Sequence, residues 1–123
     1  MIQEELHLIE TADTETIALW KVTNNPSNKN QSIFLTHGTF SDKRICLGIA
    51  KHFAELGYTC WIMEWRNHGK SPEVTKKFNF ETIAIYDLKT VFDYFFKDLK
   101  ISKIHLYFCI AILGKSGLLF IMM

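Results

Sequence analysis

Two short loops hold most of the residues in this sequence that could do chemistry. The first, residues 35–41, carries His37-Gly38 directly after an apolar run, and the second, residues 64–71, follows the next apolar run. A glycine in such a place lets the backbone approach a ligand closely and turn its N–H groups outward. Because ligands bind at the carboxyl ends of the strands in an open parallel sheet, both loops are expected at one ligand-binding edge.

The apolar runs that precede these loops predict buried strands. Residues 32–36 and 58–63 are short and almost continuously apolar, and residues 104–113 form a third such run interrupted only by His105. Strands buried on both faces have this pattern. Near the start of the chain, residues 6–10 and 16–22 are β-leaning segments separated by polar residues, which predicts a hairpin.

Two segments between these strands have helical periodicity. In residues 43–56 the apolar positions expected on one face are Ile45, Ile49, Phe53 and Leu56, and Gly57 follows as a helix stop. In residues 80–99 the expected face consists of Ile83, Tyr86 or Asp87, Leu88, Val91, Phe92, Phe95 and Leu99. Strands that alternate with helices predict an α/β fold. We therefore expect a mostly parallel sheet with an N-terminal antiparallel hairpin and flanking helices.

The residues of the two loops resemble those of the α/β-hydrolase superfamily, in its lysophospholipase-like or esterase-like branch. The segment Arg66-Asn67-His68-Gly69-Lys70-Ser71 is similar to the family stretch Asp-x-Arg-Gly-x-Gly-x-Ser. Glu64 takes the place of the Asp, and Asn67 takes the place of the first Gly. The similarity spans about residues 4–108, so the chain is expected to be a single, truncated hydrolase domain over residues 1–123 with a divergent apolar tail from about 109 to 123.

This resemblance implies a serine hydrolase that acts on carboxylic esters or lipids. It implies an oxyanion hole after His37-Gly38 that uses the backbone N–H of Thr39 or Phe40, because acyl transfer builds negative charge on the carbonyl oxygen. The remaining conspicuous residues of both loops are expected to shape them by hydrogen bonding and tight turns. These residues are His37, Gly38, Arg66, His68, Gly69 and Ser71.

The family nucleophile lies in a Gly-x-Ser-x-Gly turn, and the sequence has no such motif. The nearest candidate is Ser116 in Gly114-Lys115-Ser116-Gly117-Leu118, where Leu118 replaces the last Gly. The family order is Ser, then Asp or Glu, then His, and the seven residues after Ser116 include none of these partners. The sequence therefore predicts a protein of hydrolase ancestry that is inactive by itself. Whether the chain is an enzyme stays open at this point.

Composition and charge bear on three further questions, namely the partners, the cofactors and the location of the protein. Fourteen basic and thirteen acidic residues give a formal charge of +1 without a one-sign block, so nucleic acid is not expected as a partner. The three cysteines, Cys46, Cys60 and Cys109, lie in apolar surroundings and are expected to be buried thiols. No metal site or cofactor is predicted. Acidic residues at the N-terminus do not fit a signal peptide and indicate a cytoplasmic protein.

Two alternatives to the hydrolase interpretation concern the apolar C-terminal residues. The chain could be a non-catalytic interaction module that docks through this end, with self-association or aggregation as the related risk. Residues 104–123 are also long enough to span a bilayer. The central Lys115 opposes insertion, so a membrane anchor is not expected.

Overall fold

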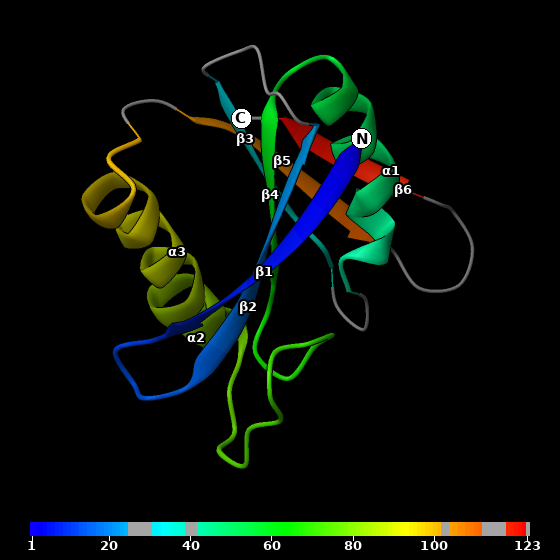
Figure 1. Cartoon of the computed structure of the whole chain (residues 1–123). Helices are drawn as coiled ribbons and strands as arrows, with labels where there is room; N and C mark the ends of the chain where they lie inside the picture. Colours follow the sequence, from blue (N-terminus) through cyan, green and yellow to red (C-terminus); the bar gives the residue numbers. More distant parts are fainter. Residues whose placement is uncertain (25–30, 39–41, 102–103, 112–117, 123) are drawn as a thin grey trace.

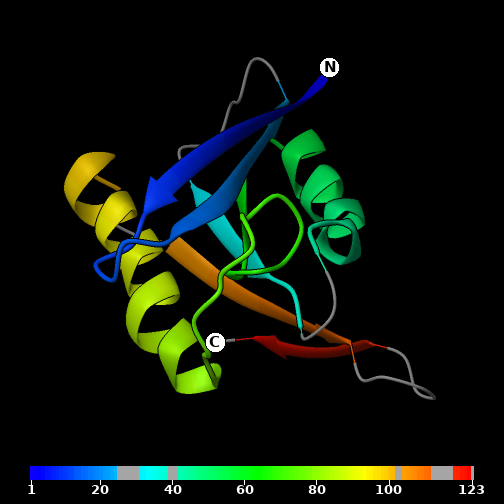
Figure 2. The same cartoon turned by 90° about the horizontal axis from the view of Figure 1, so that it is seen from below.

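A computed structural model describes residues 1–24, 31–38, 42–101, 104–111 and 118–122, and for residues 105–111 and 118–122 it describes the backbone alone. These residues form a six-stranded sheet with the order β1-β2-β4-β3-β5-β6 and helices on both of its faces (Figures 1 and 2). The strands are β1 (Ile2–Glu10), β2 (Thr16–Asn24), β3 (Ser32–Thr36), β4 (Thr59–Glu64), β5 (Ile104–Ala111) and β6 (Leu118–Met122).

The predicted N-terminal hairpin is confirmed, and both of its strands are longer than expected. β1 and β2 pair antiparallel along their whole length. Their connection closes when the N–H of Thr11 donates to the carbonyl of Glu15 at 2.8 Å and the N–H of Thr14 donates to that of Thr11 at 3.0 Å. β2 then pairs antiparallel with β4, so the hairpin extends one side of the sheet.

Parallel pairing is confined to the centre of the sheet, where β3 lies between β4 and β5. β6 pairs antiparallel with β5, so the sheet is mixed, with antiparallel pairs toward both edges. Each connection between these parallel strands contains a helical segment, because parallel strands are joined by a long crossover. Because β3 and β4 run in the same direction, the two loops selected from the sequence follow their carboxyl ends at one edge of the sheet.

Successive side chains of the central strands point to opposite faces of the sheet, so the core is divided into two clusters, one on each face. Ile33 of β3 and Ile62 of β4 point to one face, together with the helix α1 (Arg44–Glu55). Phe34 and Trp61 point to the other face and pack against a second helix that begins at residue 80. Both faces of the central strands are buried, which explains their nearly continuous apolar sequence.

The helix α1 confirms the predicted segment but presents a different set of residues to the sheet. Cys46, Ala50 and Ala54 are fully buried against the strands, while Leu56, which was expected on this face, is 47% exposed. Small side chains let the helix approach the sheet closely, and the larger apolar residues flank this contact. The helix ends at Gly57, whose φ of 99° is accessible mainly to glycine.

The second helical segment runs from residue 80 to residue 98 and changes pitch along its length. Its parts are α2 (Phe80–Thr82), the π-helical η1 (Ile83–Leu88), α3 (Lys89–Asp93) and the π-helical η2 (Tyr94–Asp98). The side chain of Asn79 accepts a hydrogen bond from the N–H of Thr82 and caps the first turn.

One row of side chains in this segment is buried. The buried row repeats every four residues and consists of Ile83, Asp87, Val91 and Phe95. The predicted face included Ile83, Val91 and Phe95, with Asp87 as an alternative to Tyr86. It also included Leu99, which is 37% exposed. The buried carboxylate of Asp87 in this row is a polar group in an otherwise apolar face and is important for the site.

Two strands, β5 and β6, follow the second helical segment. β5 confirms the expected strand at Ile104, and β6 forms a hairpin with it in which Ala111 pairs with Leu118 and Tyr107 pairs with Met122. The backbone of residues 104–111 and 118–122 is therefore extended. None of the helices in the described part of the chain is long and apolar enough to cross a bilayer.

Candidate active-site region

His37 links the ends of the two central strands. Its imidazole is fully buried, and its Nε2 accepts a hydrogen bond of 2.9 Å from the backbone N–H of Trp65. A backbone N–H can only donate, so Nε2 is the unprotonated nitrogen and Nδ1 carries the proton of the neutral ring. Nδ1–H donates to the carbonyl of Gly38 at 2.6 Å. Burial lowers the pKa of His37 to about 4, although the carbonyl of Gly38 opposes this shift. His37 is therefore neutral at pH 7, with both ring nitrogens bonded.

Trp65 is held at both its backbone and its ring. The indole N–H donates to the Thr36 hydroxyl at 2.6 Å, which ties the end of β4 to the end of β3 a second time. The indole ring lies 4.9 Å from the ring of His37 and 6.0 Å from that of Phe80. His68, whose Nδ1 is 2.9 Å from the carbonyl oxygen of Arg66, adds a fourth ring to this group, 4.9 Å from His37.

The carboxylate of Glu64 organises the turn that follows β4. Its Oε1 accepts hydrogen bonds from the indole of Trp20 at 2.7 Å and from the N–H of Lys70 at 3.0 Å. Its Oε2 accepts one from the N–H of Lys43 at 3.0 Å, at the start of α1. Glu64 is 2% exposed, so these three donors compensate for the desolvation of a buried carboxylate.

Two residues of this turn adopt the left-handed backbone conformation. Gly69 has a φ of 52°, and a β-carbon placed on it would lie 1.7 Å from Oε2 of Glu64. Asn67 has a φ of 66° at the position where the resembling motif has its first Gly. Asn tolerates this region better than other non-glycine residues, which explains why the turn survives that replacement.

Ser71 closes the same turn onto the hairpin. Its hydroxyl donates to the carbonyl of Glu64 at 2.6 Å and accepts from the N–H of Ala18 in β2 at 2.8 Å. The side chain is buried, and both bonds use main-chain groups. Ser71 thus satisfies two backbone groups where β4 leaves the sheet.

Arg66 forms a buried ionic cluster with two carboxylates that the sequence analysis did not select. Its Nε and one terminal nitrogen donate to Oδ1 of Asp87 at 2.9 and 2.8 Å. Its two terminal nitrogens also donate to the carboxylate of Asp13 at 2.8 and 2.9 Å. Hydrogen bonds from Arg66 lower the pKa of Asp13 to about 2. The backbone N–H of Arg66 donates to Asp87 as well, so one cluster joins the hairpin, the loop and the second helix.

Three predicted site residues lie outside the described part of the chain, namely the oxyanion-hole candidates Thr39 and Phe40 and the candidate nucleophile Ser116. The described residues hold no group of His, Cys, Asp and Glu side chains that could bind a metal ion. Cys46 and Cys60 are buried as expected, and burial raises the pKa of the Cys60 thiol to about 12.

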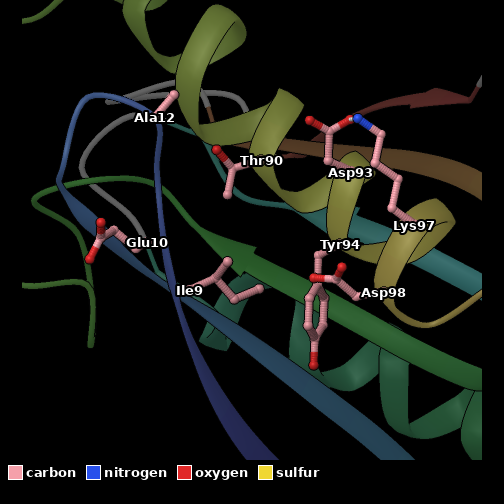
Figure 3. Close-up of a pocket in the computed structure, with 8 residues that line it drawn as sticks. All are labelled: Ile9, Glu10, Ala12, Thr90, Asp93, Tyr94, Lys97 and Asp98. Atoms are coloured by element: carbon pink, nitrogen blue, oxygen red, sulfur yellow. Dashed lines mark ion pairs between the residues drawn. The ribbon is translucent and has the colours of Figure 1, made fainter.

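Two hollows border the second helix. One lies beside Trp65 at the carboxyl ends of β3 and β4, has a volume of about 190 Å³, and is lined by Thr36, Met63, Trp65, Phe80, Ile83, Ala84 and Leu88. The other lies between the hairpin and the C-terminal half of the helix (Figure 3) and has a volume of about 250 Å³. Charged side chains line much of the second hollow, and its Asp93 pairs with Lys97 and Lys89.

No match was found among protein-family models or among curated proteins. Solved structures do match. The chain is similar to an esterase from Exiguobacterium antarcticum (TM-score 0.65, 20% identity), of which it covers 33% with 80% of its own length. It is similar to the Pyrococcus furiosus esterase Pf2001 (TM-score 0.66, 19% identity), covering 40% of that chain with 88% of its own.

A third similar structure is an alpha-beta serine hydrolase homologue from Coxiella burnetii, with a TM-score of 0.66 and 19% identity. The chain covers 50% of that protein with 83% of its own length, and so spans half or less of each of these three proteins. The strand order, the crossover helices and these similarities agree, and the chain adopts the N-terminal portion of the α/β-hydrolase fold.

Proposed function

We propose that this chain is part of a serine hydrolase that acts on small carboxylic esters or lipids, and that it contains the two loops that follow β3 and β4 at the active site. The observation that carries the proposal is the pair of hydrogen bonds by which His37 holds the loop after β3 against Trp65. These bonds fix the backbone immediately before Thr39 and Phe40, the two proposed oxyanion donors. Preorganised donors of this kind stabilise developing negative charge without reorganising during the reaction.

We propose further that the chain does not hydrolyse esters by itself. His37 cannot serve as a general base while its Nδ1 donates to Gly38 and its Nε2 accepts from Trp65. The carboxylate of Asp87 is fully buried and bonded to Arg66. Ser116 is the nearest candidate nucleophile, and Leu118 stands where the family turn has its last Gly.

A fluorophosphonate probe tests whether any serine of the purified chain is activated, with Ser116→Ala as the control variant. We expect no labelling of either protein. Labelling of the original chain that disappears in Ser116→Ala would contradict the proposed inactivity and identify Ser116 as a nucleophile.

The oxyanion donors are tested separately by amide NMR during titration with a methylphosphonate monoester, whose oxygen atoms imitate the charged tetrahedral intermediate. We expect the amide protons of Thr39 and Phe40 to move downfield as they donate to the anion. Saturable shifts confined to other amides would argue against this assignment.

A second candidate function is a non-catalytic module that docks through its apolar C-terminal end. It is favoured by the position of β6, whose sequence is Leu-Leu-Phe-Ile-Met and which forms the last strand of the described sheet. An apolar edge strand favours association with another chain. Light scattering after size-exclusion chromatography would support this candidate by revealing a defined oligomer, and a stable monomer would oppose it.

A cytoplasmic location and the absence of nucleic-acid binding also belong to the proposal. The absence of nucleic-acid binding is supported by the near balance of fourteen basic and thirteen acidic residues. Cell fractionation and an electrophoretic mobility assay test the two statements.

A further inference from the structure

The hollow beside Trp65 is built differently from the other hollow along the second helix. Its lining is apolar except for the hydroxyl of Thr36, and that hydroxyl already accepts the indole N–H of Trp65 at 2.6 Å. The described lining is thus almost entirely apolar. In the other hollow, charged residues such as Glu10, Asp93 and Lys97 contribute much of the lining (Figure 3).

The apolar hollow lies beside the starts of the two loops. Thr36 is the last residue of β3 and Trp65 follows the last residue of β4, so the hollow lies at the carboxyl ends of two neighbouring parallel strands. The indole ring of Trp65, which lines the hollow, lies 4.9 Å from the ring of His37, centroid to centroid. A group bound in the hollow would therefore lie next to the loop that carries Gly38.

The walls of the hollow are held in place before any ligand binds. Trp65 is fixed through its backbone N–H to His37 and through its indole N–H to Thr36. Ile83 and Met63 are buried at 7% and 1% exposure. Phe80, at 66% exposure, lies on the side open to solvent, where an uncovered aromatic ring loses favourable burial. An apolar ligand would cover part of this ring.

We propose that this hollow binds a compact apolar group of about the size of benzene, and that this group is the acyl part of the ester. The assignment to the acyl part rests on the proposed hydrolase function, whereas the binding of an apolar group does not. A volume of about 190 Å³ exceeds the roughly 150 Å³ of an apolar protein cavity that holds benzene. Apolar area removed from water is the main source of affinity.

The test is a titration of the whole chain with benzene, followed through the methyl signals of alanine and methionine in NMR spectra. We expect saturable shifts of the methyl groups of Met63 and Ala84, which line the apolar hollow, and none at Ala12, which lines the polar hollow. Equal shifts at Ala12 and Ala84, or shifts that do not saturate, would overturn the proposal.

A matched pair of variants makes the test specific. Ala84→Phe fills the apolar hollow from an exposed helix position and should abolish the benzene shift at Met63, while Ala12→Phe should leave it intact. Circular dichroism verifies that both variants are folded, and Ala84→Leu serves as a smaller filling residue if Ala84→Phe is not. Retention of the shift in a folded filling variant would contradict the site.

The outcome for the hydrolase function is read separately. Benzene binding that persists while the phosphonate monoester leaves Thr39 and Phe40 unchanged would preserve the apolar site and refute the proposed oxyanion hole. Absence of benzene binding together with shifts of Thr39 and Phe40 on phosphonate addition would refute the apolar site and support the oxyanion hole.

Discussion

The imidazole Nε2 of His37 accepts a hydrogen bond of 2.9 Å from the backbone N–H of Trp65. This single contact connects the residues that follow two adjacent parallel strands, β3 and β4. It also fixes the tautomer of the ring, so that Nδ1–H donates to the carbonyl of the neighbouring Gly38. A buried histidine thus has a structural role in which its neutral form is required.

We expect the stability of the protein to fall on acidification because of His37. Its pKa is lowered from 6.5 to about 4 in the folded state, so the unfolded chain binds more protons between these values. Stability therefore decreases as pH falls through this window, by about 1.4 kcal/mol per pH unit and about 3 kcal/mol in total. Urea unfolding measured between pH 7 and pH 4 checks this slope.

NMR of the histidine ring carbons provides the direct control for this prediction. The signals of His37 should remain those of the neutral Nδ1–H tautomer down to about pH 4. A midpoint near pH 6.5 for His37 would show that the ring is not held as described. Asp13, with a pKa of about 2, loses its contribution only at lower pH, so the two effects separate.

Removal of Asp87 should be among the most damaging single changes. Asp87→Ala leaves the guanidinium of Arg66, which is 2% exposed, without its fully buried partner. Breaking a buried ion pair from one side costs about 3 to 5 kcal/mol. Chemical denaturation should show this loss. Asp93→Ala, which removes an exposed partner of Lys89 on the same helix, is the matched control and should leave the midpoint nearly unchanged.

Ser71→Ala isolates the contribution of one buried hydroxyl. The change removes the acceptor for the N–H of Ala18 and the donor to the carbonyl of Glu64. Unsatisfied buried backbone groups cost about 1 to 3 kcal/mol, so we expect a loss of that size in the free energy of unfolding. Lys70→Ala, at the neighbouring exposed position, retains its backbone hydrogen bond to Glu64 and should be nearly neutral.

The order of the strands and helices up to β5 could be predicted because each has a strong local pattern. Buried parallel strands are continuously apolar, and Gly57 marks the end of α1 through its positive φ. β6 was not predicted because residues 104–123 are apolar almost throughout, and Gly114-Lys115-Ser116-Gly117, the turn signal within this run, was considered only as a candidate nucleophile turn. Periodicity alone does not divide such a run into two strands.

The site was predictable in its loops but not in its hydrogen-bond partners. The motif from Arg66 to Ser71 identified the correct turn, but Asp13 is 53 residues from Arg66 in the sequence, and no local pattern relates them. Asp87 could have been detected in the sequence, because it is a charged residue within the apolar row of its helix. That row repeats every four residues, whereas a period of 3.6 left Tyr86 and Asp87 as alternatives for the buried face.

Two glycines of the chain should respond to the same substitution in opposite directions. Gly69→Ala places a β-carbon 1.7 Å from Oε2 of Glu64 and does so at a φ of 52°, so both the carboxylate and the backbone must shift. The left-handed conformation alone costs a non-glycine residue roughly 1 to 2 kcal/mol, and displacing Glu64 from its donors adds to this. Gly48 lies in α1, and a β-carbon added there would have nothing within 4 Å of it. Gly48→Ala should therefore stabilise the protein by about 0.5 to 1 kcal/mol through helix propensity. Thermal unfolding of the two variants under identical conditions checks both signs, and a Gly69→Ala protein as stable as the original would show that Glu64 does not occupy the turn.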